Sequence, residues 1–234
     1  MFNKKKKHVQ SVARKLVTNV NPKSIVSEQF RTVRTNINFS MPDKDLKTLL
    51  FTSSAPGEGK STSAANVAIV FAQDGKKVLL VDADMRKPTM HYTFRTTNST
   101  GLSNLLTRKW GLKDVVIETE IEGLHLVTCG PIPPNPAELL GSKTMDALME
   151  ELIAEYDIVI FDAPPILSVT DAQILSNKCD GTILVLSAGS TEKASVVKAK
   201  EALVSAKANI LGTLLNNFVL EKDHYYYQYY GTGE

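Results

Sequence analysis

The stretch that decides the fold of this chain is Ala55-Pro56-Gly57-Glu58-Gly59-Lys60-Ser61. A strand-like apolar run over 48–52 precedes it and a helical pattern over 61–73 follows it, which is the setting that a phosphate-binding P-loop requires. Glycines let the backbone approach phosphates, and amides at the helix N-terminus offer them positive potential. The residues predicted to bind a nucleotide here are Pro56, Gly57, Glu58, Gly59, Lys60, Ser61 and Thr62.

One position departs from the full P-loop pattern. That pattern has a glycine five residues before Gly59, where this chain has Ser54, so the loop taken alone leaves a generic glycine-rich turn as an alternative. In the P-loop interpretation, Lys60 reaches the terminal phosphates and Ser61 is a ligand for Mg²⁺.

Two acidic segments follow apolar strand-like runs. Residues 78–81 lead into Asp82-Ala83-Asp84-Met85-Arg86, and residues 158–161 lead into Asp162. Each segment places carboxylates at the carboxyl end of a strand, where ligands bind in open α/β sheets. Hard oxygen ligands of this kind suit Mg²⁺, directly or through water. The alternative for each aspartate is a structural role in a turn or a helix N-cap.

Strand-like and helical patterns alternate along the rest of the chain. Further strands are predicted over 124–127, 182–186 and 210–215, and further helices over about 142–155 and 192–207. Nearly continuous apolar strands between helices are typical of a parallel sheet that is covered on both faces. We therefore predict an α/β P-loop NTPase fold, with a mainly parallel central sheet and helices on both of its faces.

The two ends of the chain differ in composition from this body. We predict a basic flexible arm over 1–24, a P-loop domain over 25–220 and a tyrosine-rich tail over 221–234. The arm is either a solvated segment or a site of attraction to anionic lipid or an acidic partner. Nucleic acid is not expected as a partner, because no aromatic residues interleave with the lysines after Phe2. The tail carries five clustered tyrosines, Tyr225, Tyr226, Tyr227, Tyr229 and Tyr230.

The bulk composition limits where such a chain can work. With 43% apolar and 22% charged residues it is ordinary for a globular protein, and 234 residues suffice for one substantial core. Two cysteines argue against a disulfide scaffold and fit a reducing cytoplasm. No apolar run approaches the roughly 18 residues of a membrane span, so any association with a membrane is expected to be peripheral or through a partner.

In combination these motifs resemble the bacterial tyrosine kinases of the P-loop type, which serve capsule and exopolysaccharide machinery. The resemblance rests on the P-loop, the acidic motif over 79–86, the strand that ends at Asp162 and the tyrosine cluster. Residues 28–34 also match the Glu-x-x-Arg-x-x-Arg helix of that family, and 131–140 resembles it as well. The resemblance extends over about residues 22–230.

The resemblance implies an enzyme that uses ATP and Mg²⁺ to phosphorylate its own tail on tyrosine. It further implies a ring, commonly an octamer, in which one subunit modifies the tail of a neighbour and heavy phosphorylation dissolves the ring. The ring contact of the family maps onto Glu28, Arg31 and Arg34, which we expect on the helix face opposite an apolar stripe of Val26, Phe30, Val33 and Ile37. Implied partners are a separate transmembrane modulator, a phosphotyrosine phosphatase and other protein substrates, with the kinase at the inner face of the plasma membrane.

The chemistry of phosphoryl transfer suggests roles for the site residues. Lys60 and Mg²⁺ would neutralise the γ-phosphate, and Asp82 or Asp84 would orient or deprotonate the tyrosine hydroxyl. We favour Asp82 near the acceptor, with Asp84, Asp162 and Ser61 near the metal. Arg86 would hold the strand end or contact phosphate. Asn216 follows an apolar strand at the position where related folds read adenine.

Two other functions compete with the kinase interpretation. A partitioning or positioning ATPase has the same fold, but it usually carries a lysine where this chain has Ala55, and it lacks a tyrosine cluster. A non-enzymatic interaction module would use the tyrosines as an aromatic docking patch. The presence of Lys60, Ser61 and three aspartates argues against an inactive site.

Overall fold

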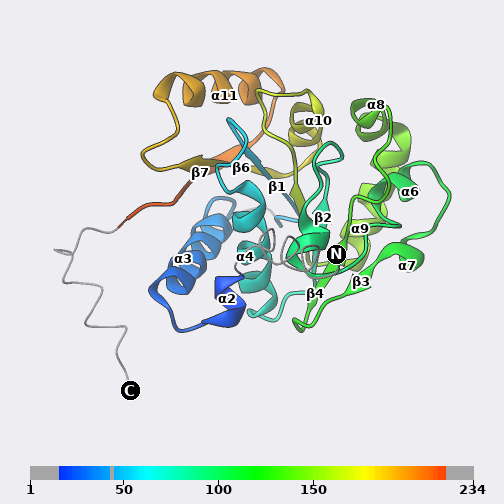
Figure 1. Ribbon diagram of the computed structural model, residues 1–234, viewed down its shortest axis with the longest axis horizontal. Coiled ribbons are helices and arrows are strands. Elements are labelled where there is room, and N and C mark those ends of the chain that lie inside the picture. Colours follow the sequence, from blue (N-terminus) through cyan, green and yellow to red (C-terminus); the bar gives the residue numbers. More distant parts are fainter. Residues whose placement is uncertain (1–15, 43–44, 220–234) are drawn as a thin grey trace, which may run out of the picture.

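The computed structural model describes residues 16–42 and 45–219 and places them around a seven-stranded sheet (Figure 1). The strand order is β3-β4-β2-β5-β1-β6-β7, and every neighbouring pair is parallel except β3 and β4. The strands are β1 (Thr48–Ser53), β2 (Val78–Asp82), β3 (Ile117–Glu118), β4 (Leu124–Val127), β5 (Ile158–Asp162), β6 (Gly181–Ser187) and β7 (Ile210–Asn216). The predicted mainly parallel α/β fold is confirmed.

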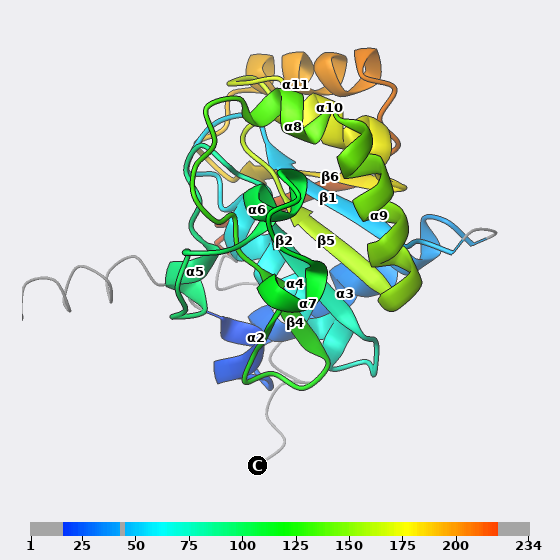
Figure 2. The ribbon, with the colours of Figure 1, turned by 90° about the vertical axis from the view of Figure 1, so that its right-hand side faces the viewer.

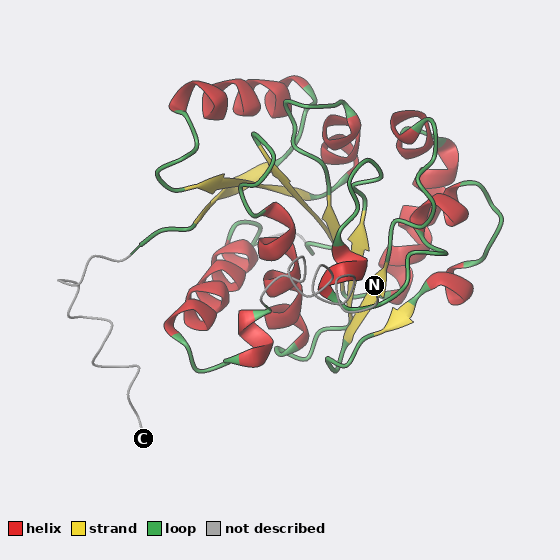
Figure 3. Ribbon diagram, viewed as in Figure 1, coloured by secondary structure: helices red, strands yellow, loops and turns green. Residues whose placement is uncertain are grey.

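Helices cover both faces of this sheet, as Figure 3 shows with the strands in yellow and the helices in red. The longer helices are α3 (Ile25–Phe39), α4 (Lys60–Ala72), α9 (Lys143–Glu155), α10 (Asp171–Lys178) and α11 (Lys193–Ser205). The short helices are α2 (Val17–Val20), α5 (Met90–Thr93), α6 (Leu102–Leu106), α7 (Leu112–Val115) and α8 (Pro136–Leu140). In Figure 2, α10 and α11 lie on one side of the sheet and α2 and α3 on the other.

The central strands are apolar because both of their faces are buried. Every residue of β1, β2 and β5 is buried. Along β1, Leu49 and Phe51 belong to the core cluster shared with α4, whereas Leu50 belongs to the opposite cluster, which includes residues of α9 and α10. This alternation follows from the two-residue period of a strand. The P-loop lies at the carboxyl end of the central strands because it directly follows Ser53, the last residue of β1.

The folded part of the chain begins earlier than the predicted boundary at residue 24. Helix α2 packs on α4 through Thr18, which is fully buried; its backbone amide and its hydroxyl donate to Asn66 Oδ1 over 3.1 and 2.9 Å. Gln73 Nε2 also donates to the Thr18 carbonyl over 3.0 Å. Residues 16–24 are therefore part of the domain and not of an arm; their composition could not reveal bonds to side chains so distant in sequence. Residues 1–15 and the tyrosines of the tail lie outside the described residues.

Helix α3 differs in part from its predicted apolar stripe. Ser24 caps the helix at its N-terminus, since its hydroxyl accepts from the Ser27 amide over 3.1 Å. Phe30, Val33 and Ile37 pack against the core, as predicted. Val26, however, is 46% exposed, and Ser27 is buried instead because its hydroxyl donates to backbone carbonyls of the preceding turn. None of the helices in the described part of the chain is long and apolar enough to cross a membrane.

Candidate active site

The strand order brings the sequence motifs together. Strands β2, β5 and β1 are adjacent, and Asp162 pairs in register with both Asp82 of β2 and Phe51 of β1. The carboxyl ends of these parallel strands therefore meet at one edge, where the P-loop follows β1. Three segments that are far apart in sequence converge there, as their positions at strand ends predicted.

The P-loop conformation depends on glycine at two positions. Gly57 and Gly59 have φ values of +86° and +93°, in the left-handed region that side chains disfavour. Gly59 is also the N-cap of α4, and a Cβ atom there would lie 1.9 Å from Nδ2 of Asn216. Glycine at position 59 therefore lets the loop backbone pack closely against Asn216. This packing holds the backbone amides of the loop at the N-terminus of α4, where anions bind.

The Lys60 ammonium lies at the centre of a cluster of oxygens. Its Nζ is 3.0 Å from Asp84 Oδ2, 3.2 Å from Asp162 Oδ1 and 3.3 Å from Ser61 Oγ. Burial alone would lower the pKa of Lys60, but the charges of Asp162 and then Asp84 outweigh burial and raise it. Lysine therefore stays charged, and hard oxygen atoms converge around a cation at the head of the P-loop.

Asp82 is held differently from the other two aspartates. It is fully buried, and its Oδ2 accepts from the amides of Thr89 and Met90, both over 2.9 Å. Burial, reinforced by repulsion from Asp162, raises the pKa of Asp82 to about 7 despite those amides and Lys60. A carboxyl group with this pKa exchanges its proton near neutral pH, as a general base does.

Arg86 is positioned by a residue whose role the sequence did not reveal. Its Nε and one terminal nitrogen donate to the two carboxylate oxygens of Asp171, each over 2.9 Å. Asp171 lies in the first turn of α10 and is fully buried, whereas the Arg86 side chain is 42% exposed. Asp171, 85 positions away in sequence, fixes the guanidinium in a planar two-bond pair. The hydrogen bonds to Asp171 raise the pKa of Arg86.

Glu58 and Asn216 join the P-loop to the loop that follows β6 and to the last residue of β7. The Glu58 carboxylate accepts from the Ser54 hydroxyl over 2.8 Å, from the Ala55 amide over 2.9 Å and from the Thr191 hydroxyl. Asn216 Nδ2 donates to the Glu58 carbonyl over 3.0 Å. The Glu58 side chain therefore points into the protein, and Ser54, which departs from the P-loop pattern, acts as its hydrogen-bond donor. Sequence reasoning gave no role to Thr191.

A cavity of about 460 Å³ opens beside this loop. Its lining includes Lys60, Thr62, Asp84, Arg86 and Pro164, so the P-loop, the acidic motif of β2 and the segment after Asp162 share one space. Asp82 and Asn216 are not part of that lining. The cavity thus places the cations Lys60, Arg86 and Lys87 beside the carboxylate of Asp84.

Comparison with known proteins agrees with this geometry. The AAA domain family matches residues 46–191, from β1 to the loop after β6. Tyrosine-protein kinase YwqD of Bacillus subtilis (strain 168) is 53% identical over 219 residues, which cover 94% of this chain and 92% of YwqD. Tyrosine-protein kinase CpsD of Streptococcus agalactiae serotype III (strain NEM316) is 42% identical over 190 residues, which cover 81% of each chain.

This chain belongs to the bacterial P-loop tyrosine kinases of the capsule type. The crystal structure of the chimerical protein CapA2B2 superposes on it with a TM-score of 0.85 at 44% identity, covering 89% of this chain and 93% of that one. The kinase therefore has the nucleotide-binding P-loop fold that its sequence predicted. Relatives named as tyrosine kinases, at this identity and coverage, favour it over the partitioning ATPase and the non-enzymatic module.

The kinase does not present Glu28, Arg31 and Arg34 as one free helix face. Arg34 Nη1 donates to the Val70 carbonyl over 2.7 Å and pairs with Asp74 at 3.2 Å, so it is tied to α4 and its C-terminal turn. Arg31 pairs with Glu28 and donates to the Pro22 carbonyl over 2.8 Å. The expectation that all three lie opposite the apolar stripe is wrong, because an arginine long enough to reach the α4 carbonyls gains a buried acceptor there. Glu28, at 66% exposure, remains accessible.

Proposed function

We propose that this kinase transfers the γ-phosphoryl group of ATP to tyrosines of its own tail, and that it does so between subunits of a ring. The acceptors are Tyr225, Tyr226, Tyr227, Tyr229 and Tyr230. The observation that carries the proposal is the Lys60 ammonium, which Asp84, Asp162 and Ser61 hold at the head of the P-loop. A fixed cation there meets the charge of the terminal phosphates as the phosphoryl group moves.

Mg²⁺ fits the donor set of the same cluster. Ser61, Asp84 and Asp162 supply hard oxygen atoms, and these already surround a cation, the Lys60 ammonium. These three residues would hold the ion directly or through water, and the bound ion would neutralise charge on the phosphates. Mg²⁺ is commonly bound by one or two carboxylates together with substrate phosphates, and Asp84 and Asp162 are two such carboxylates.

The transfer needs a group that accepts the tyrosine proton. In the step, the oxygen of a tail tyrosine forms a bond to the γ-phosphorus while the bond from that phosphorus to the β,γ-bridging oxygen breaks, which releases ADP. The phenolic proton passes to Asp82 through a bridging water, because Asp82 is fully buried and lies outside the lining of the cavity; its pKa of about 7 suits that task. Arg86, fixed by Asp171, contacts phosphate at the rim of the cavity. Asn216, beside the P-loop, contacts adenine.

Incubation of the purified protein with labelled ATP and Mg²⁺ tests this function. We expect label on tyrosine, confined to a peptide from residues 221–234, and a rate that rises as pH increases through about 7, because Asp82 accepts a proton only when ionised. Replacing Asp82 by Asn should slow transfer by about 10²–10⁴-fold and remove that pH step. Labelled serine, or label only outside the tail, would contradict the proposal.

Subunits of the ring would contact one another through the exposed part of α3, the helix that carries Glu28 and Arg31. Glu28 and Arg31 face solvent to different degrees, 66% and 30%, and form one ion pair that a neighbouring subunit can engage. Arg34 instead supports the domain through α4. Phosphates on several neighbouring tails add about −1.5 to −2 charges each and would weaken the ring by repulsion.

Replacing both Glu28 and Arg31 by Ala should therefore give a smaller species in light scattering while the melting temperature changes little. The matched control replaces Lys198 and Glu201, on the exposed side of α11, by Ala. It also removes one positive and one negative charge and should leave the mass unchanged. An unchanged mass for the first variant, with an oligomeric wild type, would show that this pair does not form the contact.

The partners of the kinase follow from its family. We propose a transmembrane modulator that holds the kinase at the inner face of the plasma membrane, a phosphotyrosine phosphatase that resets the tail, and other protein substrates. The similar solved structure is that of a chimerical protein, CapA2B2, and a chimera joins parts of two polypeptides, which supports a role for a second polypeptide here. The pathway served is capsular or exopolysaccharide synthesis and export, and co-purification of the native kinase with membrane proteins tests the modulator.

A further inference from the structure

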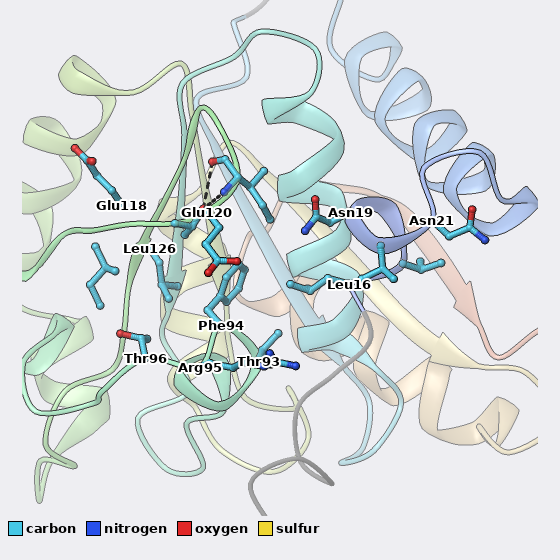
Figure 4. Close-up of a pocket in the computed structure, with 15 residues that line it drawn as sticks. Leu16, Asn19, Asn21, Thr93, Phe94, Arg95, Thr96, Glu118, Glu120 and Leu126 are labelled. Carbon is cyan, nitrogen blue, oxygen red and sulfur yellow. Dashed lines mark hydrogen bonds between the residues drawn. The ribbon is translucent and has the colours of Figure 1, made fainter. Parts of the chain in front are cut away.

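A groove of about 870 Å³ lies away from the P-loop, between α2 and the edge of the sheet at β3 and β4 (Figure 4). Leu16, the N-cap of α2, and Val20, the last residue of α2, line one side. Phe94 and Leu126 line the other side, with the turn that follows β3. Val20 is 81% exposed although it lines a concave apolar surface, so this surface lacks a cover within residues 16–42 and 45–219.

The described part of the chain begins in this groove. Leu16, the first described residue, lies in the lining, so the fifteen residues before it start at the rim. That segment contains Val9, Val12 and Ala13, all within seven positions of Leu16, and six basic residues without an acid. An extended chain gains at most about 3.5 Å per residue, so seven residues from Val9 reach about 25 Å, enough to follow the groove.

We propose that residues 1–15 of the same chain bind in this groove. Val9, Val12 and Ala13 lie on its apolar surface, and the basic residues face Glu118 and Glu120, the two carboxylates of the lining. Figure 4 shows Glu120 and Phe94 on the side opposite Leu16. Arg95 is the basic residue of the lining, so the lining carries two negative charges and one positive charge. This net negative charge favours a cationic segment.

The other occupants fit this surface less well. A phosphorylated tail carries several negative charges and would be repelled by Glu118 and Glu120. The arm of a second copy has the same composition, but a segment tethered at Leu16 has an effective concentration in the millimolar range, which a chain free in solution does not reach at ordinary protein concentrations. The arm of a neighbouring ring subunit is the remaining competitor, and the excess of unlabelled chain in the experiment below distinguishes it. The chain's own segment is therefore the favoured occupant.

Both walls of the groove connect to the active site. Thr93 and Phe94 belong to α5 and its C-cap, and the amides of Thr89 and Met90 at the start of that helix bind the Asp82 carboxylate. Residue Thr18, in α2, bonds to Asn66 of the P-loop helix. A segment bound between these walls would restrain the two helices that hold the acidic motif and the P-loop.

Distances between spin labels in the full-length protein test the proposal. One label is attached at Gln10→Cys, in the proposed segment, and the other at Thr97→Cys, an exposed position next to the groove. Buried Cys129 and Cys179 have raised pKa values, that of Cys129 to about 12, and so react poorly with thiol reagents. We expect one narrow, short-distance population that persists in a large excess of unlabelled chain.

Charge reversal supplies the specificity control. Glu118→Lys with Glu120→Lys should abolish the short-distance population, whereas Glu150→Lys with Glu151→Lys, an equal charge change on the exposed side of α9, should preserve it. A pair at Gln10→Cys and Glu201→Cys on α11 should give only long distances. A broad distribution for the first pair would overturn the proposal. A short distance that appears only when singly labelled chains are mixed would also overturn it and would identify a second copy as the occupant.

Discussion

Replacing Lys60 by Met should abolish phosphorylation of the tail. The Lys60 side chain is 12% exposed and its Nζ bonds to Asp84 and Asp162, so it is the described lysine that bonds both carboxylates of the site. Methionine keeps much of the length of the side chain but offers no charge to the terminal phosphates. Removal of a single preorganised donor typically costs about 10²–10³-fold in rate. Loss of a full charge that also positions the nucleotide should leave no measurable transfer.

The same substitution should lower stability without unfolding the protein. Two buried carboxylates lose their cation, and such a loss costs about 3–5 kcal/mol when no counter-ion replaces it. Circular dichroism should therefore show native secondary structure with a lower melting temperature, and added Mg²⁺ should recover part of the difference. Lys200→Met, on the exposed side of α11, is the matched control and should keep full activity. Normal tail phosphorylation in a Lys60→Met preparation without wild-type chains would be incompatible with the kinase mechanism.

The parts of this structure that were predicted correctly are those marked by patterns of neighbouring residues in the sequence. Residues 48–73 combine an apolar strand, a glycine-rich loop and a helix, and the loop determines where all three begin and end. The convergence of Asp82, Asp84 and Asp162 followed from one rule about the ends of parallel strands. These features required no knowledge of which side chains meet across the sheet.

The parts that were missed depend on contacts between distant residues. Asp171 bonds Arg86 across 85 positions of sequence, and Thr191 donates to Glu58 across 133 positions. Arg34 was misplaced because an arginine on a helix surface can extend to a neighbouring helix, which helical periodicity does not encode. Helices α5 to α8 have four or five residues, too few for an apolar period to be recognised.

Transfer between subunits is the second large effect that we expect. Tyr225 lies nine positions after Asn216, the end of β7, and an extended chain gains at most about 3.5 Å per residue, so the segment spans at most roughly 30 Å. A segment of that length reaches an adjacent subunit in a ring. Asn216 itself lies beside the P-loop of its own subunit, so a tail that returned to its own cavity would have to reverse direction within the eight residues between Asn216 and Tyr225.

The most direct measurement mixes two variants that are each unable to label themselves on the tail. One is Lys60→Met with all five tyrosines intact. The other keeps Lys60 but carries Phe at the five positions Tyr225, Tyr226, Tyr227, Tyr229 and Tyr230. In a mixture shown by light scattering to co-assemble, labelled ATP and Mg²⁺ should place label on the Lys60→Met chain. If that chain stays unlabelled while wild type labels itself at a rate independent of its concentration, tail phosphorylation occurs within one subunit and the mechanism proposed here is wrong.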